Sequence, residues 1–223
     1  MAEYIRQQSL VNQQKLAELR IAIVGTGSIG SFTALALTKM GCEHLTLWDK
    51  DQVELHNVSN QFFNKDSIGL PKVVAAVDEC KRYTPDKVDV EVFNEVYDQQ
   101  SLDKFDVVIA LTDNIEGRKA AFENAQKSAK TQLFIDGRMG GELFKGYSFN
   151  PHSALADKYY QNYIEGVENE ELPCTARTII YNVMMSSSII TSYVKKFVNG
   201  EPLPFELIFS FQTFQLMKSK EES

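Results

Sequence analysis

Short apolar runs alternate with amphipathic segments along most of the chain. The apolar runs are rich in β-branched residues and stop at turn-forming residues, which predicts buried β-strands. The intervening segments carry apolar residues at helical spacing. The predicted strands are residues 20–24, 45–48, 88–93, 105–111, 133–135 and 142–149, and the predicted helices are 31–40, 71–81 and 115–127. Regular alternation with short connections predicts an α/β fold with a doubly wound, mostly parallel sheet and helices on both faces.

The two ends of the chain follow other patterns. Residues 1–18 are polar and helix-prone, and residues 173–198 form a long apolar segment that predicts a helix packed on the sheet. Residues 205–216 alternate apolar and polar positions, which predicts two terminal antiparallel strands. No repeat or Pro/Gly-rich linker interrupts the sequence. We therefore expect one domain, 1–223, made of an N-terminal helical segment (1–18), a core (19–150), a crossover loop (151–173) and a C-terminal helix with strands (174–223).

Composition narrows the functional classes. The 223 residues carry a net charge of -7, with a pI near 5.1, which disfavours a protein whose surface binds nucleic acid or an anionic membrane. The N-terminus has no apolar signal core, and no stretch approaches the roughly 18 unbroken apolar residues of a transmembrane helix. We expect a cytoplasmic protein without a membrane partner.

A glycine-rich turn joins the first predicted strand to the first predicted helix. Gly25, Gly27 and Gly30 form a G-x-G-x-x-G motif there, and such glycines let backbone N–H groups approach a phosphate at a helix N-terminus. Asp49 ends the next strand, where a carboxylate can hold ribose hydroxyls. This Rossmann-like pattern makes 19–150 a nucleotide-binding core, but it fits NAD, FAD and ATP equally well.

Two further residues suit ATP chemistry. Lys72 lies just inside a predicted helix start and can place a positive charge on a triphosphate. Asp113 follows a central strand at the ligand-binding edge of the sheet and can hold Mg²⁺. The alternatives without a function are that Lys72 is a solvated helix residue and that the Asp113-Asn114 pair only caps the next helix. Asn57 fits a simple turn.

An ordered series of short motifs resembles the ThiF/MoeB/HesA family and the ubiquitin-activating enzymes. The match runs from residue 4 to about residue 150 and continues more weakly to about residue 200. It includes Tyr4-Ile5-Arg6-Gln7-Gln8-Ser9-Leu10, Gly25–Gly30, Asp49-Lys50-Asp51, Asn57-Val58-Ser59-Asn60-Gln61, Gly69-Leu70-Pro71-Lys72, Leu111-Thr112-Asp113-Asn114, Arg118 and Arg138-Met139-Gly140-Gly141-Glu142. Each motif alone is weak, whereas their common order is specific.

The resemblance implies ATP-dependent adenylation of the C-terminal carboxylate of a small β-grasp, ubiquitin-like or sulfur-carrier protein ending in Gly-Gly. It assigns catalysis to Asp113, Lys72, Arg6 and Cys174, with Mg²⁺ on Asp113 and Arg6 reaching across a homodimer to the partner's ATP. The implied nucleotide contacts are Gly25, Gly27, Gly30, Asp49, Asp51, Asn57, Asn60, Gln61, Lys72, Asn114 and Arg118.

The sequence departs from the family at two places. Asn60 stands where the family has an arginine, so the triphosphate loses one cation unless Arg118, Arg138 or Lys65 replaces it. The paired C-x-x-C zinc motifs of many relatives are absent, which indicates a small member of the family.

One of the three cysteines is a candidate nucleophile. Cys42 and Cys80 lie within predicted helix–strand elements, whereas Cys174 precedes the C-terminal helix, with Arg177 one turn further on. A helix N-terminus and a nearby cation lower the pKa of a thiol, so Cys174 can attack an acyl-adenylate. A buried or capping cysteine is the alternative.

Other functions stay open at this point. The activated carboxylate could belong to a ribosomal peptide or a tRNA base modification. A NAD-dependent oxidoreductase would need an acid or base, and His44, His56 and His152 have no obvious partner. Asn60 leaves room for a nucleotide-binding scaffold with weakened catalysis.

Overall fold

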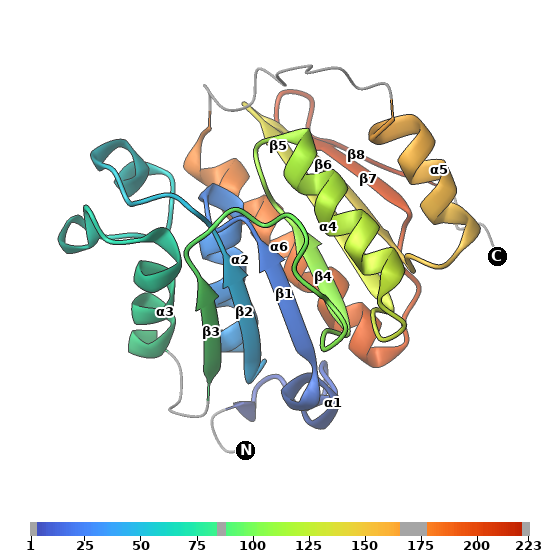
Figure 1. Cartoon of the computed structure of the whole chain (residues 1–223), viewed down its shortest axis with the longest axis horizontal. Helices are drawn as coiled ribbons and strands as arrows, with labels where there is room; N and C mark the ends of the chain where they lie inside the picture. The colour runs from blue at the N-terminus through green and yellow to red at the C-terminus, as the bar shows by residue number, and fades with distance from the viewer. Residues whose placement is uncertain (1–3, 84–87, 166–177, 220–223) are drawn as a thin grey trace.

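The computed structural model describes residues 4–83, 88–165 and 178–219. Figure 1 shows one layered α/β unit. The helices are α1 (Gln13–Glu18), α2 (Ser28–Met40), α3 (Lys72–Tyr83), α4 (Ile115–Lys127), α5 (Ala154–Tyr163) and α6 (Ile180–Asn199), with short 3-10 turns η2 (Leu55–Ser59) and η3 (Lys65–Ser67). The strands are β1 (Arg20–Val24), β2 (His44–Trp48), β3 (Asp89–Phe93), β4 (Val107–Ala110), β5 (Leu133–Gly140), β6 (Leu143–Phe149), β7 (Glu206–Ser210) and β8 (Gln215–Lys218).

These strands form a single eight-stranded sheet in the order β3-β2-β1-β4-β5-β6-β7-β8. Strands β3, β2, β1, β4 and β5 pair in parallel, and β6, β7 and β8 continue the sheet in antiparallel register. The predicted Rossmann-like doubly wound fold with C-terminal antiparallel strands is confirmed. The carboxyl ends of β1, β2 and β4 lie side by side at the upper edge in Figure 1.

Helices cover both faces of the sheet (Figure 1). Helices α2, α3 and α6 enclose one hydrophobic core, while α4 and α5 enclose the other. Alternate residues of β1 serve the two cores: Ile21 and Ile23 point into the first, and Ala22 and Val24 into the second. Burial on both faces explains why the central strands read as unbroken apolar runs.

Three expected segments differ in the structure. The region expected as a crossover loop contains helix α5, because Ala156 and Tyr159 bury one face of it in the second core. The C-terminal helix begins at Ile180 within the described residues. Residues 5–10 of the N-terminal segment form turns, and only Gln13–Glu18 is α-helical.

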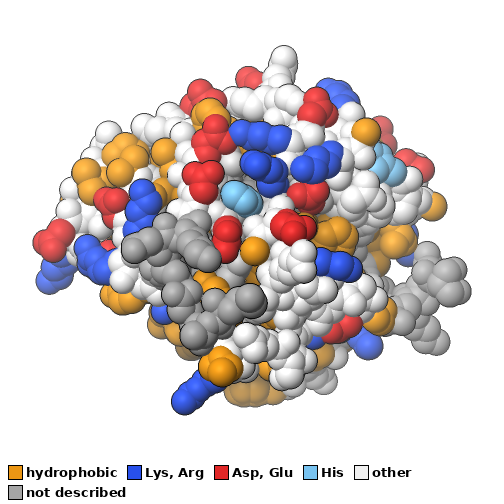
Figure 2. All heavy atoms as spheres, turned by 90° about the horizontal axis from the view of Figure 1, so that it is seen from below, with side chains coloured by type: hydrophobic (Ala, Val, Ile, Leu, Met, Phe, Trp, Pro, Cys, Tyr) orange, Lys and Arg blue, Asp and Glu red, His pale blue; other side chains and the backbone are white. Residues whose placement is uncertain are grey.

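The amino-terminal edge of the sheet carries charges of both signs. Figure 2 views the molecule from this side and shows Lys and Arg gathered beside Asp and Glu. An exposed ion pair here joins Lys104 to Glu91, and a partly buried one joins Lys130 to Asp106 at 3.5 Å. Exposed pairs of this kind stabilise a fold by only about 1 kcal/mol or less. Among the described helices, none has both the length and the apolar character to cross a bilayer.

Candidate functional site

The glycine-rich turn lies where β1, β2 and β4 end. The Gly25 N–H donates to the Trp48 carbonyl at 2.8 Å, and the Leu111 N–H donates to the Val24 carbonyl at 2.7 Å. These bonds hold the ends of β1, β2 and β4 next to one another. The loops that follow these strands therefore begin side by side, and residues distant in sequence meet at this edge. The position agrees with the rule that ligands of open α/β sheets bind at the carboxyl ends of the strands.

Two of the three motif glycines are required by close packing. Gly25 has φ +99°, and a Cβ there would lie 2.7 Å from the Leu111 carbonyl group; a Cβ on Gly30 would lie 2.0 Å from the Gly25 carbonyl oxygen. Gly27, in contrast, has no atom within 4 Å of an added Cβ. The turn is therefore tight against β4 on its inner side and open at Gly27, directly before the N-terminus of α2. That open cradle fits a phosphate group.

Asp49 joins the turn to the end of β2. Its carboxylate accepts hydrogen bonds from the backbone N–H of Thr26 at 2.8 Å and of Asp51 at 2.9 Å. Burial raises the pKa of Asp49 above its usual value, although these two N–H groups and the nearby charge of Lys72 oppose the rise. Asp49 is thus a partly desolvated acceptor held in a fixed orientation beside the turn.

Lys72 is held at the same edge. Its ammonium donates to the Asp51 carboxylate at 2.9 Å, and its backbone N–H donates to the Asp51 carbonyl at 2.9 Å. The Lys72 side chain is only 10% exposed. This burial contradicts the alternative of a solvated helix lysine. Lys72, Asp51 and Asp49 lie next to one another at this edge.

Asp113 and Asn114 divide two tasks between them. The Asn114 side chain accepts from the Gly117 N–H at 2.7 Å and so caps α4. Asp113 remains exposed and accepts a hydrogen bond from the Asn114 amide at 3.1 Å. The cap is Asn114, which leaves the Asp113 carboxylate accessible after the end of β4.

The predicted nucleotide contacts Asn57, Asn60 and Gln61 differ in their surroundings. Asn57 is buried and accepts from the Glu54 N–H at 2.9 Å, which supports the turn interpretation. The Asn60 amide donates to the Thr178 hydroxyl. The side-chain oxygens of Asn60 and Gln61 are buried without a hydrogen-bond partner.

Arg118 is buried where β4 and β5 reach the carboxyl edge of the sheet, and its guanidinium binds protein partners there. It forms an ion pair with Asp136, and it also donates to the carbonyls of Gly137, at 3.1 Å, and Thr112. Arg138 donates to the other oxygen of Asp136 at 2.7 Å. Two of the cations considered as replacements for the missing arginine at position 60 are therefore committed to one carboxylate.

Asp136 is the residue that sequence reasoning missed. It is fully buried, and Tyr159 on α5 also donates to it at 2.7 Å. Burial alone would raise the pKa of Asp136, but the Arg118 and Arg138 guanidinium groups outweigh burial and hold the pKa below its usual value. The available signal was a charged residue immediately after the buried run Leu133–Ile135.

Arg6 is far from this cluster in its own chain. The neighbouring Gln7 side chain donates to the Lys39 carbonyl at 3.2 Å, in the last turn of α2. Helix α2 has 13 residues, so at about 1.5 Å per residue its last turn lies about 20 Å from Gly27. The structure does not bring Arg6 together with Lys72 and Asp113.

The cysteines divide clearly. Cys42 and Cys80 are buried, and burial raises their pKa values to about 12 and about 11, so both are protonated at neutral pH. Cys174 lies outside the described residues. In the described ranges no three side chains of His, Cys, Asp or Glu cluster as a metal site. Mg²⁺ bound to phosphate oxygens and one or two carboxylates does not require such a cluster.

Solved structures share this fold. The crystal structure of PaaA superposes with a TM-score of 0.77 at 23% identity, covering 97% of this chain and 68% of that one. Escherichia coli MccB, crystallised with ATP, superposes with a TM-score of 0.72 at 16% identity, covering 93% of this chain and 65% of that one. The fold and its glycine-rich turn define a Rossmann-like α/β protein.

The chain belongs to the ThiF family, whose model matches residues 3–222. Among curated proteins it is similar to ubiquitin-like modifier-activating enzyme 5 of Drosophila persimilis, with 34% identity over 54% of this chain and 35% of that protein. The Caenorhabditis elegans enzyme of the same name is 29% identical over 64% of this chain and 37% of its own length. The matched region spans about a third of each relative.

The buried Arg118–Asp136–Arg138 cluster predicts a large stability effect. We expect Asp136→Asn to lower the free energy of unfolding by about 3 kcal/mol or more, because it leaves two buried guanidinium groups without their carboxylate. Glu91→Gln, which removes an exposed ion pair with Lys104, is the matched control and is expected to cost about 1 kcal/mol or less. Urea unfolding at pH 7 measures both values.

The lowered pKa of Asp136 also sets the direction of a pH effect. Its contribution to stability is fully present above the unfolded pKa of an aspartate, about 3.9. It is lost as pH falls through the lower folded pKa. Unfolding curves from pH 7 to pH 2 should show Asp136→Asn losing less stability than the wild type at the acid end. Parallel curves would contradict the assignment.

Proposed function

We propose that this chain is an adenylyltransferase domain that uses ATP to activate the C-terminal carboxylate of a small ubiquitin-like protein or a peptide. One observation carries the proposal. Lys72 and Asp49, from separate segments, are fixed at the edge where Gly27 leaves open space and Asp113 stays exposed. ThiF family membership and the names of the similar activating enzymes support the same chemistry.

Each residue has a role that follows from its chemistry. The triphosphate lies against the N-terminus of α2, where backbone N–H groups favour anions. Asp49 accepts from the ribose hydroxyls, and Lys72 places its charge on the phosphates. An ammonium has three N–H donors, so Lys72 keeps donors for phosphate oxygens after its bond to Asp51. Asp113 holds Mg²⁺, which when bound neutralises charge on the phosphates.

The reaction joins two anions, so charge and position dominate its cost. A carboxylate oxygen of the partner attacks the α-phosphorus, a new P–O bond forms, and the bond to the bridging oxygen breaks as pyrophosphate leaves. Lys72 stabilises the charge on the departing phosphates, and the fixed Asp49 holds the ribose end of the nucleotide. A partner tail of Gly-Gly suits this site because glycine has no side chain to obstruct the approach.

Arg6 would act on the nucleotide of a second copy of the chain. Its own glycine-rich turn is about 20 Å away by the length of α2. A homodimer in which each Arg6 reaches the partner's phosphates would use this otherwise remote residue. We also retain Cys174 as the acceptor of the activated partner, since the two buried thiols of Cys42 and Cys80 are unsuited to attack.

Nucleotide binding tests the role of Lys72. With a fluorescent ATP analogue and Mg²⁺, we expect Lys72→Met to weaken binding about tenfold or more, since a phosphate-binding charge is lost. Lys81→Met, at the exposed far end of the same helix, is the control and should bind as the wild type does. Equal binding by both variants, or displacement of the analogue by NAD at lower concentration than by ATP, would count against the assignment.

Pyrophosphate exchange tests the reaction itself. We expect labelled pyrophosphate to enter ATP only when a ubiquitin-like protein ending in Gly-Gly is added, and not when its last two residues are removed. Asp113→Asn should lower the exchange rate by about 100-fold because it weakens the metal contact. Asp103→Asn, on an exposed loop, is the control. Binding without exchange would indicate a nucleotide-binding scaffold.

Mixing two inactive variants tests the action of Arg6 across subunits. Arg6→Ala and Lys72→Met should each be nearly inactive in the exchange assay. After denaturation and joint refolding in equal amounts, about a quarter of wild-type activity should return, because half the dimers gain one complete site of two. Activity no higher than that of the separate variants would mean that Arg6 does not act in trans.

A further inference from the structure

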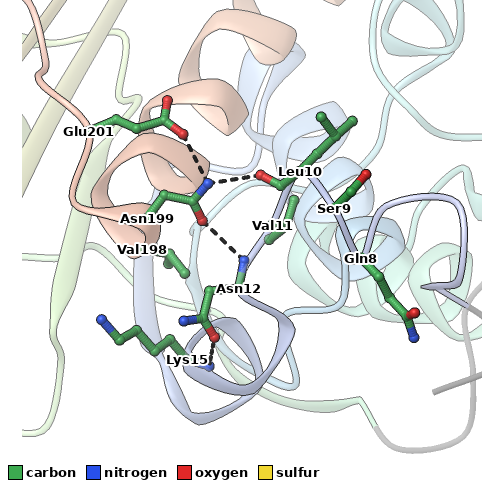
Figure 3. Close-up of a pocket in the computed structure, with 9 residues that line it drawn as sticks. All are labelled: Gln8, Ser9, Leu10, Val11, Asn12, Lys15, Val198, Asn199 and Glu201. Carbon is green, nitrogen blue, oxygen red and sulfur yellow. Dashed lines mark hydrogen bonds between the residues drawn. The ribbon is translucent and has the colours of Figure 1, made fainter.

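The N-terminal segment is fastened to the end of α6 by one side chain. Figure 3 shows Asn199 between this segment and Glu201. Its carbonyl oxygen accepts from the Asn12 N–H at 3.0 Å, and its amide donates to the Leu10 carbonyl at 2.8 Å. The same amide donates to the Glu201 carboxylate at 2.9 Å. We call Asn199 and Glu201 the clasp.

The sequence around Asn199 explains why it is held in place. Asn199 ends α6, and Gly200 adopts a left-handed conformation with φ +68°, which terminates the helix. The turn brings the Glu201 N–H back to the Lys196 carbonyl at 2.8 Å and sets the Glu201 carboxylate beside Asn199. Lys195 also donates to that carboxylate and, with Asn199, lowers the pKa of Glu201 to about 2. The Glu201 carboxylate is therefore ionised throughout the pH range of an enzyme assay.

The clasp lines a shallow pocket of about 390 Å³ (Figure 3). Its wall residues are Gln8, Ser9, Leu10, Val11, Asn12, Lys15, Val198, Asn199 and Glu201. Both polar side-chain atoms of Asn199 and both carboxylate oxygens of Glu201 make hydrogen bonds within the chain. The pocket is thus better explained as the boundary where the N-terminal segment packs against the end of α6 than as a ligand site.

The segment that the clasp holds precedes the first α-helix of the described residues. Residues 5–10 form turns, so its course depends on tertiary contacts. Besides the clasp these include the Gln7 side chain on the Lys39 carbonyl at 3.2 Å, and Val11, which is buried in the same core as Val198. Arg6 is exposed on this segment.

We propose that Asn199 is a positioning residue that fixes the course of the N-terminal segment and thereby the place from which Arg6 acts. The role of Arg6 rests on the proposed function, in which Arg6 completes the site of a second copy. Asn199 touches no substrate, and it acts through two backbone hydrogen bonds far from the glycine-rich turn. A misplacement of about 1 Å at a catalytic group is enough to reduce a rate strongly.

The experiment compares Asn199→Ala with Lys15→Ala, which changes the same pocket without removing the clasp. In Asn199→Ala we expect faster amide hydrogen exchange in residues 4–12, while the sheet and α4 keep wild-type protection. Pyrophosphate exchange should fall about tenfold in kcat, with the affinity for the fluorescent ATP analogue unchanged. Lys15→Ala should match the wild type in all three measurements, and an effect equal to that of Asn199→Ala would overturn the clasp in favour of a ligand pocket.

A double-variant cycle separates positioning from general destabilisation. If Asn199 acts through Arg6, Arg6→Ala combined with Asn199→Ala should be no slower than Arg6→Ala alone. Multiplied losses, or unchanged exchange in residues 4–12, would overturn the proposal. Asn199→Asp keeps the acceptor for Asn12, loses the donor to Leu10 and sets a second carboxylate against Glu201, so it should release the segment at nearly constant volume.

The outcome also distinguishes this inference from the proposed function. If Arg6→Ala retains full activity, the role of Arg6 fails, and the positioning of Arg6 for catalysis fails with it. Hydrogen exchange then still decides whether Asn199 orders the segment. If Arg6→Ala is inactive but Asn199→Ala is fully active, the proposed function stands and the clasp inference alone is overturned.

Discussion

The carboxylate of Asp49 organises the carboxyl edge of the sheet. It accepts from the Thr26 N–H in the glycine-rich turn and from the Asp51 N–H after β2, and so ties two loops to one side chain. Asp51 is thereby set to receive Lys72 through both its carbonyl and its carboxylate. A buried charge is costly unless it is hydrogen-bonded, and these backbone donors compensate it. The geometry at the head of α2 and α3 depends on this one acceptor.

The fold could be predicted because its signals are local. The apolar run in β1, the turn at Gly25 and the periodic pattern of α2 follow from strand and helix periodicity. Asp49 and Asp113 could be placed at one edge because parallel strands end on the same side of a sheet, whereas Lys72 was placed only at the start of a helix. The structure adds the contacts that hold these residues there, namely the Asp49–Thr26 hydrogen bond and the ion pair between Lys72 and Asp51.

Other features could not be predicted because they depend on distant partners. The Asp136 carboxylate accepts hydrogen bonds from Arg118 on α4, Arg138 on its own strand and Tyr159 on α5. The single sequence does not state that these groups meet. Helix α5 was missed for a related reason: its buried face consists of Ala156 and Tyr159, a weak periodic signal that the aromatic cluster around Phe122 and Phe134 makes decisive.

Asp136 also limits how this sequence can vary. One buried carboxylate pairs with two guanidinium groups, so three positions on two elements depend on one another electrostatically. Replacing either arginine by a neutral residue changes the field acting on the other, whereas a compensating change must involve Asp136 itself. Contacting charges of this kind are not independent in their energetic effects. Across homologous chains, positions 118, 136 and 138 should therefore change together or not at all.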